Sequence, residues 1–594
     1  MCSAKPPHPT NHMVYARHKQ DYLQLDAMWL GHIHDGGKST KKWSTLVHHG
    51  VIFYPDYQPH GLPIRYNGQQ IFLAPEAEEW ITYYAHPRFD KYKTDRFNKN
   101  FFSDWKKKLT PEQRKQITDP SQCDLTQIRD HIVQQRDQKK QESDRMDKQA
   151  KEAKKQSNDQ IKSRYMVAMV DGVEQTIDNF MVEPPTIFTG RGSHPLSGKI
   201  KARLKPEDII LNIGTMPIPI PYKYDPIESK LIPMDARWGS VVSDNSLEWI
   251  ACWQNNVTMK NNYARFGRKS GFKMRSDEAK YDLARKLKKR IKKIRAKNEA
   301  NIRSSDMETR QLATALYLID SLALRIGNEK TEDQADTVGV STLRIKNVAL
   351  LENHIVKLDF LGKDSIRYVN KFVVPETIYA NIKDFHTGKD NSQQLFDMID
   401  SDTLNKYIKR FMKKLTSKVF RTYNASSLMQ RELKKITQKY HAYDKKDKLQ
   451  KIRHEYELAN LKVARLANHQ KVQSTGSTQQ IDKTTQRTAD LASKLRRLER
   501  DKDTRVAESK DTKAIGKKIG SLKQKIKELK NKKKLQTEAK TLSANTSKIN
   551  YIDPRITVAF LKANGLEDSI DKFFTKTHQK QFEWAMQTDA QYRF

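Results

Sequence analysis

Hydrophobic residues divide the chain into a mixed first half and a mainly helical second half. Short apolar runs bounded by Gly, Pro and Asn predict β-strands at Val51–Pro55, Gln70–Leu73 and Ile209–Ile213. Between about Gln134 and Arg164 charged and amide residues dominate, which predicts one or two exposed helices. From about Asp277 onward apolar residues recur at helical spacing.

Two patterns in the helical half place candidate residues near element ends. Gln311–Leu324 is strongly apolar and predicts a buried helix that stops before Gly327. In Ile355–Val374 apolar and polar residues alternate, which predicts two strands of a hairpin with its turn at Leu361–Asp364.

The segment from about Thr488 to Lys540 predicts a helical hairpin. Its apolar residues recur at heptad-like spacing, at Leu491, Leu495, Leu498, Ile515, Ile519, Leu522, Ile526 and Leu529. An interruption at Ser509–Asp511 allows two helices to fold back as an antiparallel coiled coil. Lysine dominates the other faces, so a solvated spacer and a basic arm lying near DNA both remain open.

Composition indicates several domains and a polyanionic partner. A chain of 594 residues is too long for one compact core, and 110 Lys and Arg against 71 Asp and Glu give a net charge of +39. Nucleic acid is the favoured partner. A membrane is not predicted, because no stretch reaches the ~18 apolar residues of a spanning helix. Cys2, Cys123 and Cys252 are far apart, so no disulfide framework or Cys-based zinc site is expected.

The first 40 residues predict a short polar arm. They lack the apolar core of a secretory signal and contain histidines at irregular spacing, namely His8, His12, His18, His32 and His34. Gly36–Thr40 resembles the end of a phosphate-binding loop. The glycine that this loop requires five residues before Gly37 is replaced by His32, so nucleotide binding is not predicted.

Five separated residues form a chemically coherent set: Arg325, Lys363, Arg421, His469 and Tyr551. Each alone is more often structural. Together they supply what a tyrosine needs to attack a phosphodiester. Two guanidiniums and a histidine can stabilise the charge on the non-bridging oxygens. The lysine can protonate the departing 5′-oxygen, and the tyrosine is the covalent nucleophile. The set predicts metal-free cleavage and resealing of DNA through a phosphotyrosine link.

The stretches around these residues resemble the eukaryotic type IB DNA topoisomerases. They are Phe188–Gly192, Leu324–Lys330, Phe360–Tyr368, Lys418–Ser426, Asn468–Gln470 and Ser547–Thr557. Similarity runs in order from about Lys41 to Phe594. It implies an α+β multidomain DNA clamp with a mixed α/β cap, a mainly α catalytic lobe and a helical-hairpin coiled-coil linker. The implied domains are an arm (1–40), a cap (41–273), a catalytic core (274–472), a linker (473–541) and a C-terminal domain (542–594).

The resemblance also implies roles for individual residues. Tyr551 would form a 3′-phosphotyrosine, Arg325, Arg421 and His469 would stabilise the transition state, and Lys363 would protonate the 5′-hydroxyl. The enzyme would relax positive and negative supercoils by strand rotation and religation, as a monomer around double-stranded DNA, without ATP, metal or other cofactor. A camptothecin site is implied at three further positions, which are Arg191, Asp364 and Asn550.

Two departures and two alternatives accompany this resemblance. Family members in the nucleus usually carry a long charged N-terminal extension, and only a short arm precedes Lys41 here, so a viral or organellar origin stays open beside the nucleus. Thr189 replaces an arginine common in relatives. A tyrosine recombinase would share the catalytic set, and a non-enzymatic DNA-binding protein would share the charge.

Overall fold

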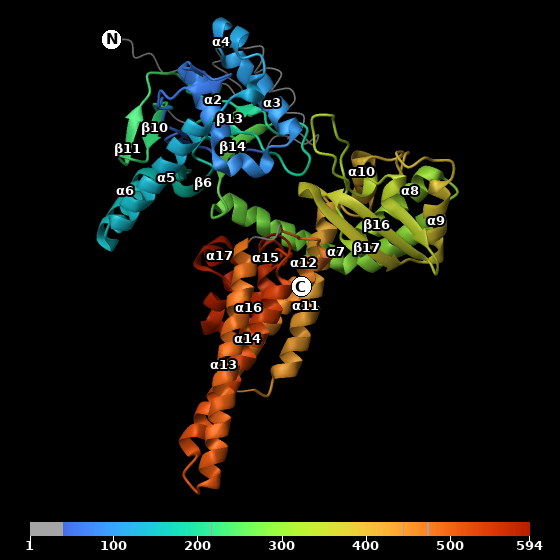
Figure 1. The fold of residues 1–594 in the computed structure, drawn as a ribbon. Helices are drawn as coiled ribbons and strands as arrows, with labels where there is room; N and C mark the ends of the chain where they lie inside the picture. Colours follow the sequence, from blue (N-terminus) through green and yellow to red (C-terminus); the bar gives the residue numbers. More distant parts are fainter. Residues whose placement is uncertain (1–39, 215–216, 444, 472–474) are drawn as a thin grey trace, which may run out of the picture. The chain divides into compact units, whose positions relative to one another are not determined.

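The computed structural model describes residues 40–214, 217–443, 445–471 and 475–594. The predicted polar arm, its histidines, Cys2 and most of the loop-like segment at Gly36 lie outside these ranges. The chain forms two compact units (Figure 1). The N-terminal unit comprises the residues up to Arg275 together with Lys330–Ala335, and the C-terminal unit comprises Ser276–Glu329 and Asp336–Phe594. Helix α7 (Gly271–Ile302) runs from the first unit into the second.

The N-terminal unit is built on β-sheets. Its largest sheet contains, in spatial order, β1 (Leu46–His48), β5 (Val167–Val170), β6 (Val173–Asp178), β14 (Asn261–Phe266), β13 (Trp249–Gln254), β9 (Ile209–Asn212) and β12 (Ser240–Val242). Smaller sheets pair β11 (Lys230–Pro233) with β10 (Tyr222–Asp225) and β2 (Ile52–Phe53), β3 (Ile64–Tyr66) with β4 (Gln69–Ile71), and β7 (Thr186–Ile187) with β8 (Ile200–Lys201). The strands predicted at Val51–Pro55, Gln70–Leu73 and Ile209–Ile213 are therefore confirmed in kind.

Helices of the N-terminal unit divide into buried and exposed groups. They are α2 (Pro75–Ala85), α3 (Asp95–Trp105), α4 (Pro111–Gln116), α5 (Thr126–Arg145) and α6 (Lys148–Ser163). Helix α3 buries Phe97, Phe101 and Trp105, which recur every four residues and so share one face against α2. By contrast α5 and α6 are mostly exposed, and they confirm the charged helices predicted between Gln134 and Arg164.

The C-terminal unit is mainly helical around one three-stranded antiparallel sheet. The sheet contains β15 (Val348–Leu351), β16 (Ile355–Gly362) and β17 (Ile366–Val373). After α7 the helices are α8 (Met307–Leu322), α9 (Glu376–His386), α10 (Ser401–Phe411), α11 (Ser417–Tyr440), α12 (Lys445–Leu466), α13 (Thr475–Ala507), α14 (Lys513–Glu538), α15 (Ala544–Asn550), α16 (Pro554–Ala563), α17 (Lys576–Gln581) and α18 (Glu583–Met586). The chain as a whole is α+β. None of the helices in the described ranges is both long and apolar enough to cross a membrane.

Two predicted element ends in this unit were wrong. Helix α8 ends at Leu322 because Ala323 adopts a left-handed conformation with φ 51°, so Gly327 is not its terminator. Strand β16 continues through Gly362, and the turn consists of Lys363–Ser365, which starts two residues later and ends one residue later than predicted. The alternation itself is confirmed, because Val356, Leu358 and Phe360 all face the core of the unit.

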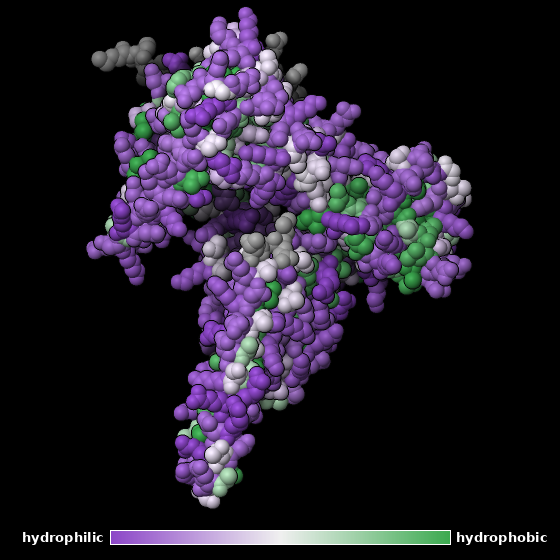
Figure 2. Space-filling model, viewed as in Figure 1, coloured by the Kyte–Doolittle hydropathy of each residue, from purple (hydrophilic) through white to green (hydrophobic). Residues whose placement is uncertain are grey.

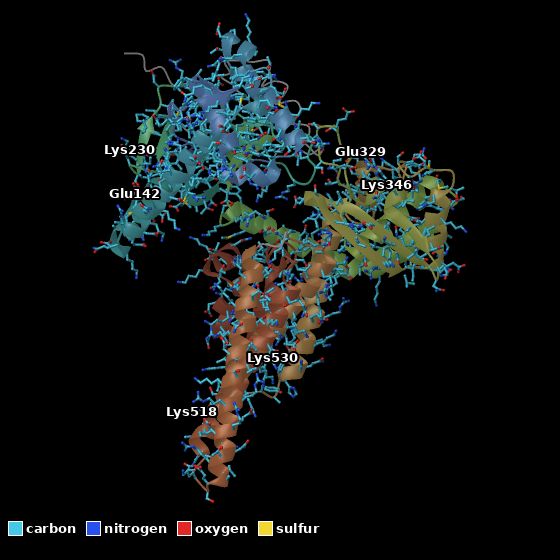
Figure 3. The ribbon with its side chains drawn as sticks, in the orientation of Figure 1. Glu142, Lys230, Glu329, Lys346, Lys518 and Lys530 are labelled. Carbon is cyan, nitrogen blue, oxygen red and sulfur yellow. The ribbon has the colours of Figure 1, made fainter. Side chains whose placement is uncertain are left out.

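Helices α13 and α14 form the predicted hairpin, called here the basic hairpin. Lys523 of α14 pairs with Glu499 of α13 at 2.9 Å. Helix α13 begins at Thr475, earlier than the predicted Thr488. The prediction missed its first turns because they contain Thr and Gln and lack apolar residues at heptad spacing. Figure 2 shows hydrophilic side chains over both helices, and Figure 3 shows Lys518 and Lys530 projecting from α14. With ten lysines and two glutamates, α14 gives this hairpin a strongly positive surface.

The two chain ends of the basic hairpin meet at its base. The Lys471 amide donates to the carbonyl oxygen of Thr541 at 2.9 Å, and the Ser543 amide donates to that of His469 at 2.6 Å. Gln470 and Leu542 form an isolated antiparallel bridge between these two contacts. The segment that enters the hairpin is thus paired directly with the segment that leaves it.

Candidate active site

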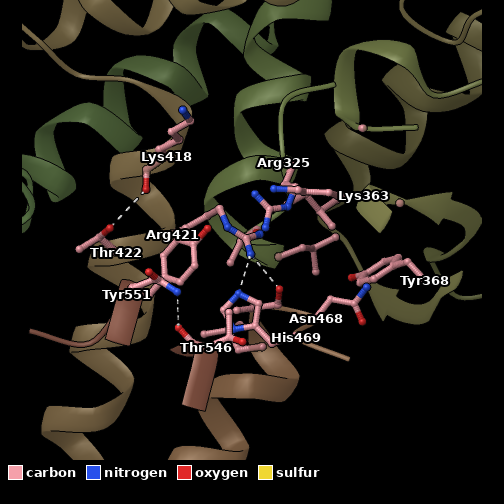
Figure 4. Close-up of a pocket in the computed structure, with 18 of the residues that line it drawn as sticks. Arg325, Lys363, Tyr368, Lys418, Arg421, Thr422, Asn468, His469, Thr546 and Tyr551 are labelled. Carbon is pink, nitrogen blue, oxygen red and sulfur yellow. Dashed lines mark hydrogen bonds between the residues drawn. The ribbon is translucent and has the colours of Figure 1, made fainter. Parts of the chain in front are cut away.

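The C-terminal unit contains a cavity of about 720 Å³ that collects most of the predicted site residues (Figure 4). All five proposed catalytic residues line it, as do Asp364 and Asn550. Its cationic lining residues are Lys280, Arg325, Lys363, Lys414, Lys418 and Arg421. Asp364 is the one carboxylate among the described residues that line the cavity, so the site is strongly positive and suited to an anionic ligand.

Arg421 occupies the centre of the site because it caps two helices at once. It lies near the start of α11 and is only 4% exposed. Its guanidinium donates to the carbonyl oxygen of Ala323, after α8, and to that of Ala467, after α12, the latter at 2.8 Å. Carbonyls at helix C-termini lack intrahelical partners and attract cations. Because Arg325 and His469 each follow one of these carbonyls by two residues, Arg421 draws both segments to itself.

A crossing of two glycine backbones holds the Arg325 segment. A Cβ atom on Gly339 would lie 2.4 Å from the Cα atom of Gly327, closer than real side chains approach. Beside this crossing the amides of Val340 and Ser341 donate to the carbonyl oxygens of Arg325 and Ile326, at 2.9 and 2.7 Å. The backbone that carries Arg325 is therefore fixed against its neighbour by close approach and hydrogen bonds.

Gly339→Ala is expected to loosen this crossing. Overpacking of this kind typically costs about 1–3 kcal/mol, so the amides of Val340 and Ser341 should exchange with solvent roughly 5- to 150-fold faster. Hydrogen exchange followed by mass spectrometry measures the effect. Gly516→Ala is the matched control, because a Cβ atom there meets nothing within 4 Å. Unchanged exchange at residues 338–343 in the Gly339 variant would show that the two backbones can accommodate an added Cβ atom.

Lys363 lies at the tip of the β16–β17 hairpin and is exposed to solvent. The following residues, Asp364 and Ser365, have φ angles of 68° and 57°, so the chain reverses in a tight left-handed turn. Behind the turn, the rings of Phe360 and Tyr368 lie 5.1 Å apart and anchor the two strands to the core. The hairpin therefore presents an exposed lysine side chain at its tip, and its strands are packed against the core behind it.

Tyr551 follows α15 and is tied to α11 through its own backbone. The Ser426 hydroxyl donates to the Tyr551 carbonyl oxygen at 3.0 Å and accepts from the Asp553 amide at 3.0 Å. The Tyr551 ring lies 5.0 Å from the His469 ring and 5.0 Å from the Arg421 guanidinium carbon. The Asp553 side chain caps the N-terminus of the next helix, α16. Tyr551 therefore lies in the short connection between α15 and α16, and Ser426 of α11 holds this connection in place.

Electrostatics tune the tyrosine and the histidine in ways that suit a phosphate ligand. Burial raises the pKa of the Tyr551 phenol, but the guanidiniums of Arg421 and Arg325 outweigh it and hold this pKa below its ordinary value. Burial, reinforced by the same two arginines, lowers the pKa of His469 to about 3. His469 is therefore neutral at physiological pH, and the lowered pKa of Tyr551 makes loss of its phenol proton easier.

One predicted site residue does not line the cavity, and two serines near Tyr551 were not predicted. Arg191 belongs to the N-terminal unit, where it is exposed in a loop between two left-handed glycines, Gly190 and Gly192. Sequence reasoning gave no role to Ser426 or Ser547, although Ser547 lies one helical turn before Tyr551. In the described part of the chain no group of three or more His, Cys, Asp or Glu side chains is arranged to hold a metal ion.

Three family models match the chain in order. They are described as eukaryotic DNA topoisomerase I, DNA binding fragment (residues 41–266), eukaryotic DNA topoisomerase I, catalytic core (269–502), and C-terminal topoisomerase domain (523–594). The site residues of the C-terminal unit other than Tyr551 and Asn550 lie within the second match, and these two lie within the third.

Curated relatives extend this similarity over nearly the whole chain. DNA topoisomerase 1 alpha of Arabidopsis thaliana is 40% identical over 580 residues, which cover 94% of this chain and 60% of the relative. DNA topoisomerase 1 of Caenorhabditis elegans is 39% identical, covering 93% and 68%, and that of Homo sapiens is 36% identical, covering 93% and 72%. The chain belongs to the eukaryotic DNA topoisomerase I family. It spans about 60% of the length of the Arabidopsis relatives.

Proposed function

We propose that the protein is a type IB DNA topoisomerase that relaxes positive and negative supercoils through a transient 3′-phosphotyrosine. The observation that carries this proposal is the meeting of Tyr551 with two arginines, a histidine and a lysine in one cationic cavity. A binding protein needs positive charge, but it has no need of a half-buried phenol whose pKa is lowered by two guanidiniums.

Each step of the reaction then has a group to perform it. The Tyr551 phenol releases its proton to solvent, its oxygen attacks the phosphorus, and the bond from phosphorus to the 5′-oxygen breaks. Arg325, Arg421 and His469 donate to the non-bridging oxygens, where negative charge grows. Lys363 gives its proton to the departing 5′-oxygen. After rotation of the free strand, the 5′-hydroxyl attacks the phosphotyrosine and the same groups act in reverse.

The first experiment is relaxation of negatively and positively supercoiled plasmid in EDTA without ATP. Parallel reactions stopped in SDS trap protein joined to DNA. Relaxation of both signs, with the protein on the 3′ end of the broken strand, is the expected result. A folded protein that binds DNA and relaxes neither sign would overturn the proposal. Strand exchange between specific sites in its place would identify a tyrosine recombinase.

The basic hairpin contributes no residue to the catalytic set, so its excision should leave activity. Its two ends are already paired at Lys471 and Thr541, and a short Gly/Ser loop can join them in place of residues 472–540. We expect cleavage rates within about tenfold of the full chain, with weaker DNA binding at higher salt because many lysines are lost. A folded excision variant that forms no covalent adduct would give the hairpin a part in the chemistry.

The proposal extends to partner, drug and location. Double-stranded DNA is the substrate of a monomer that closes around it, and the location is nuclear. Arg191 of the N-terminal unit and Asp364 and Asn550 of the C-terminal unit are each proposed to contact camptothecin when the drug traps the adduct. An SDS-trapped adduct whose yield does not rise with camptothecin would contradict the drug site, and a fluorescent fusion excluded from the nucleus would contradict the location.

A further inference from the structure

Ser547 connects the nucleophile to the histidine. It is 0% exposed, and its Oγ lies 2.6 Å from Nδ1 of His469. It belongs to α15, four residues before Tyr551, and its carbonyl oxygen accepts from the Tyr551 amide at 2.9 Å. One turn of helix therefore holds the phenol through its backbone and the imidazole through its side chain.

The contacts of Ser547 restrict where the imidazole proton lies. A neutral imidazole has one N–H donor and one acceptor nitrogen. Within the described residues, His469 Nδ1 is the one partner of the Ser547 hydroxyl. If Nδ1 carried the proton, the buried serine O–H would lack an acceptor, which costs about 1–3 kcal/mol. The hydroxyl is satisfied when it donates to Nδ1, and this leaves the proton of His469 on Nε2.

The opposite nitrogen faces the cavity beside Arg421. Nε2 of His469 and Nη2 of Arg421 lie 3.4 Å apart, longer than a usual hydrogen bond of about 2.9–3.0 Å. The short contact at Nδ1 therefore determines the tautomer more strongly than the long contact at Nε2. Two N–H donors at this separation can reach a common oxygen, and both line the cavity into which a phosphoryl oxygen would enter.

We propose that Ser547 is a positioning residue that keeps His469 in the tautomer with its proton on Nε2, ready to donate to a non-bridging phosphoryl oxygen. This inference rests on the proposed function. Because Ser547 and Tyr551 share one turn of α15, placing the tyrosine for attack also places the histidine. A tyrosine that moves away with α15 removes the hydroxyl from Nδ1, so the two groups are ready together or not at all.

Two measurements test the proposal independently. Selective ¹⁵N-histidine labelling, with the His469 signals identified by their loss in His469→Gln, reports which ring nitrogen is protonated. We expect Nε2–H in the wild type and a shift toward the other tautomer in Ser547→Ala. A wild type with the proton on Nδ1 would overturn the proposal whether or not the protein cleaves DNA.

The second measurement is the single-turnover cleavage rate on an oligonucleotide duplex. Ser547→Ala should slow cleavage about 10- to 100-fold, the scale found when a partner that orients a metal-bound histidine is removed. Ser547→Thr keeps the hydroxyl and should recover most of the rate. In a His469→Gln background Ser547→Ala should cause no further loss, because the group it orients is already gone. An equal loss in both backgrounds would mean that Ser547 only supports the fold. A wild type that forms no adduct would refute the proposed function and leave the tautomer result standing.

Discussion

Tyr551→Phe is expected to abolish covalent adduct formation and plasmid relaxation, a loss of at least ~10⁴-fold in cleavage rate. The substitution removes a single oxygen atom. The ring that lies 5.0 Å from the His469 ring and from the Arg421 guanidinium carbon remains, so packing and the capping of both helices are retained. DNA affinity and thermal stability should therefore stay close to those of the wild type. SDS-trapped adducts, relaxation and equilibrium binding measure the three properties on one preparation.

Tyr379→Phe is the matched control for this change. Its hydroxyl donates to the Leu351 carbonyl oxygen at 3.0 Å, and it does not line the cavity. Loss of one phenol oxygen there should leave cleavage intact. An adduct that persists in Tyr551→Phe would assign the nucleophile to another residue, and a peptide map of that adduct would identify it.

Arg421→Lys should lower the cleavage and religation rates about 10²–10³-fold, the scale for removing one preorganised donor to a developing oxyanion. Lysine keeps the positive charge, so DNA binding should change little. It lacks the planar fork that donates to Ala323, to Ala467 and to a ligand at the same time. One ammonium group cannot serve all three directions from the position of a guanidinium. Single-turnover rates in both directions are the measurement.

Arg303→Lys provides the comparison for the arginine change. Arg303 pairs on the surface with Glu299 at 2.7 Å and does not line the cavity, so its rates should match the wild type. If Arg421→Lys cleaves at the wild-type rate, the guanidinium geometry has no part in the chemistry and only its charge acts.

The residue types of the site could be predicted from the sequence, but their arrangement in space could not. The residue types that meet in the cavity could be selected from the chain because a tyrosine nucleophile needs partners of known kinds. Their meeting depends on Arg421 binding carbonyl oxygens 98 residues before it and 46 residues after it, and no local pattern reports such contacts. The same contact explains why the end of α8 was misplaced. Ala323 turns its carbonyl oxygen to Arg421 in a left-handed conformation that glycine usually adopts.

Periodic elements were easier to predict than their ends or their polar contacts. The β16–β17 alternation and the basic hairpin follow directly from period 2 and heptad-like spacing. The first turns of α13 show no apolar periodicity. Their threonines donate hydrogen bonds to carbonyl oxygens of the same helix, as Thr484 does to Gln480 at 2.9 Å, and such contacts leave no periodic pattern in the sequence. Nothing in the sequence pointed to Ser426 or Ser547, because each acts through hydrogen bonds of its hydroxyl to distant residues, and composition and spacing do not reveal such bonds.

The crowding of six cations around one carboxylate in the cavity has a consequence for the folded state. Arg325 and Arg421 repel each other where burial weakens solvent screening, and this repulsion lowers the stability of the folded protein. A phosphodiester, the proposed substrate, would offset this repulsion on binding and so stabilise the folded form. If the proposed chemistry takes place there, the requirements of catalysis and of stability oppose each other at this cavity. Replacing these cations with neutral residues should raise thermal stability and abolish the proposed activity. Variants selected only for thermal stability should therefore accumulate such replacements.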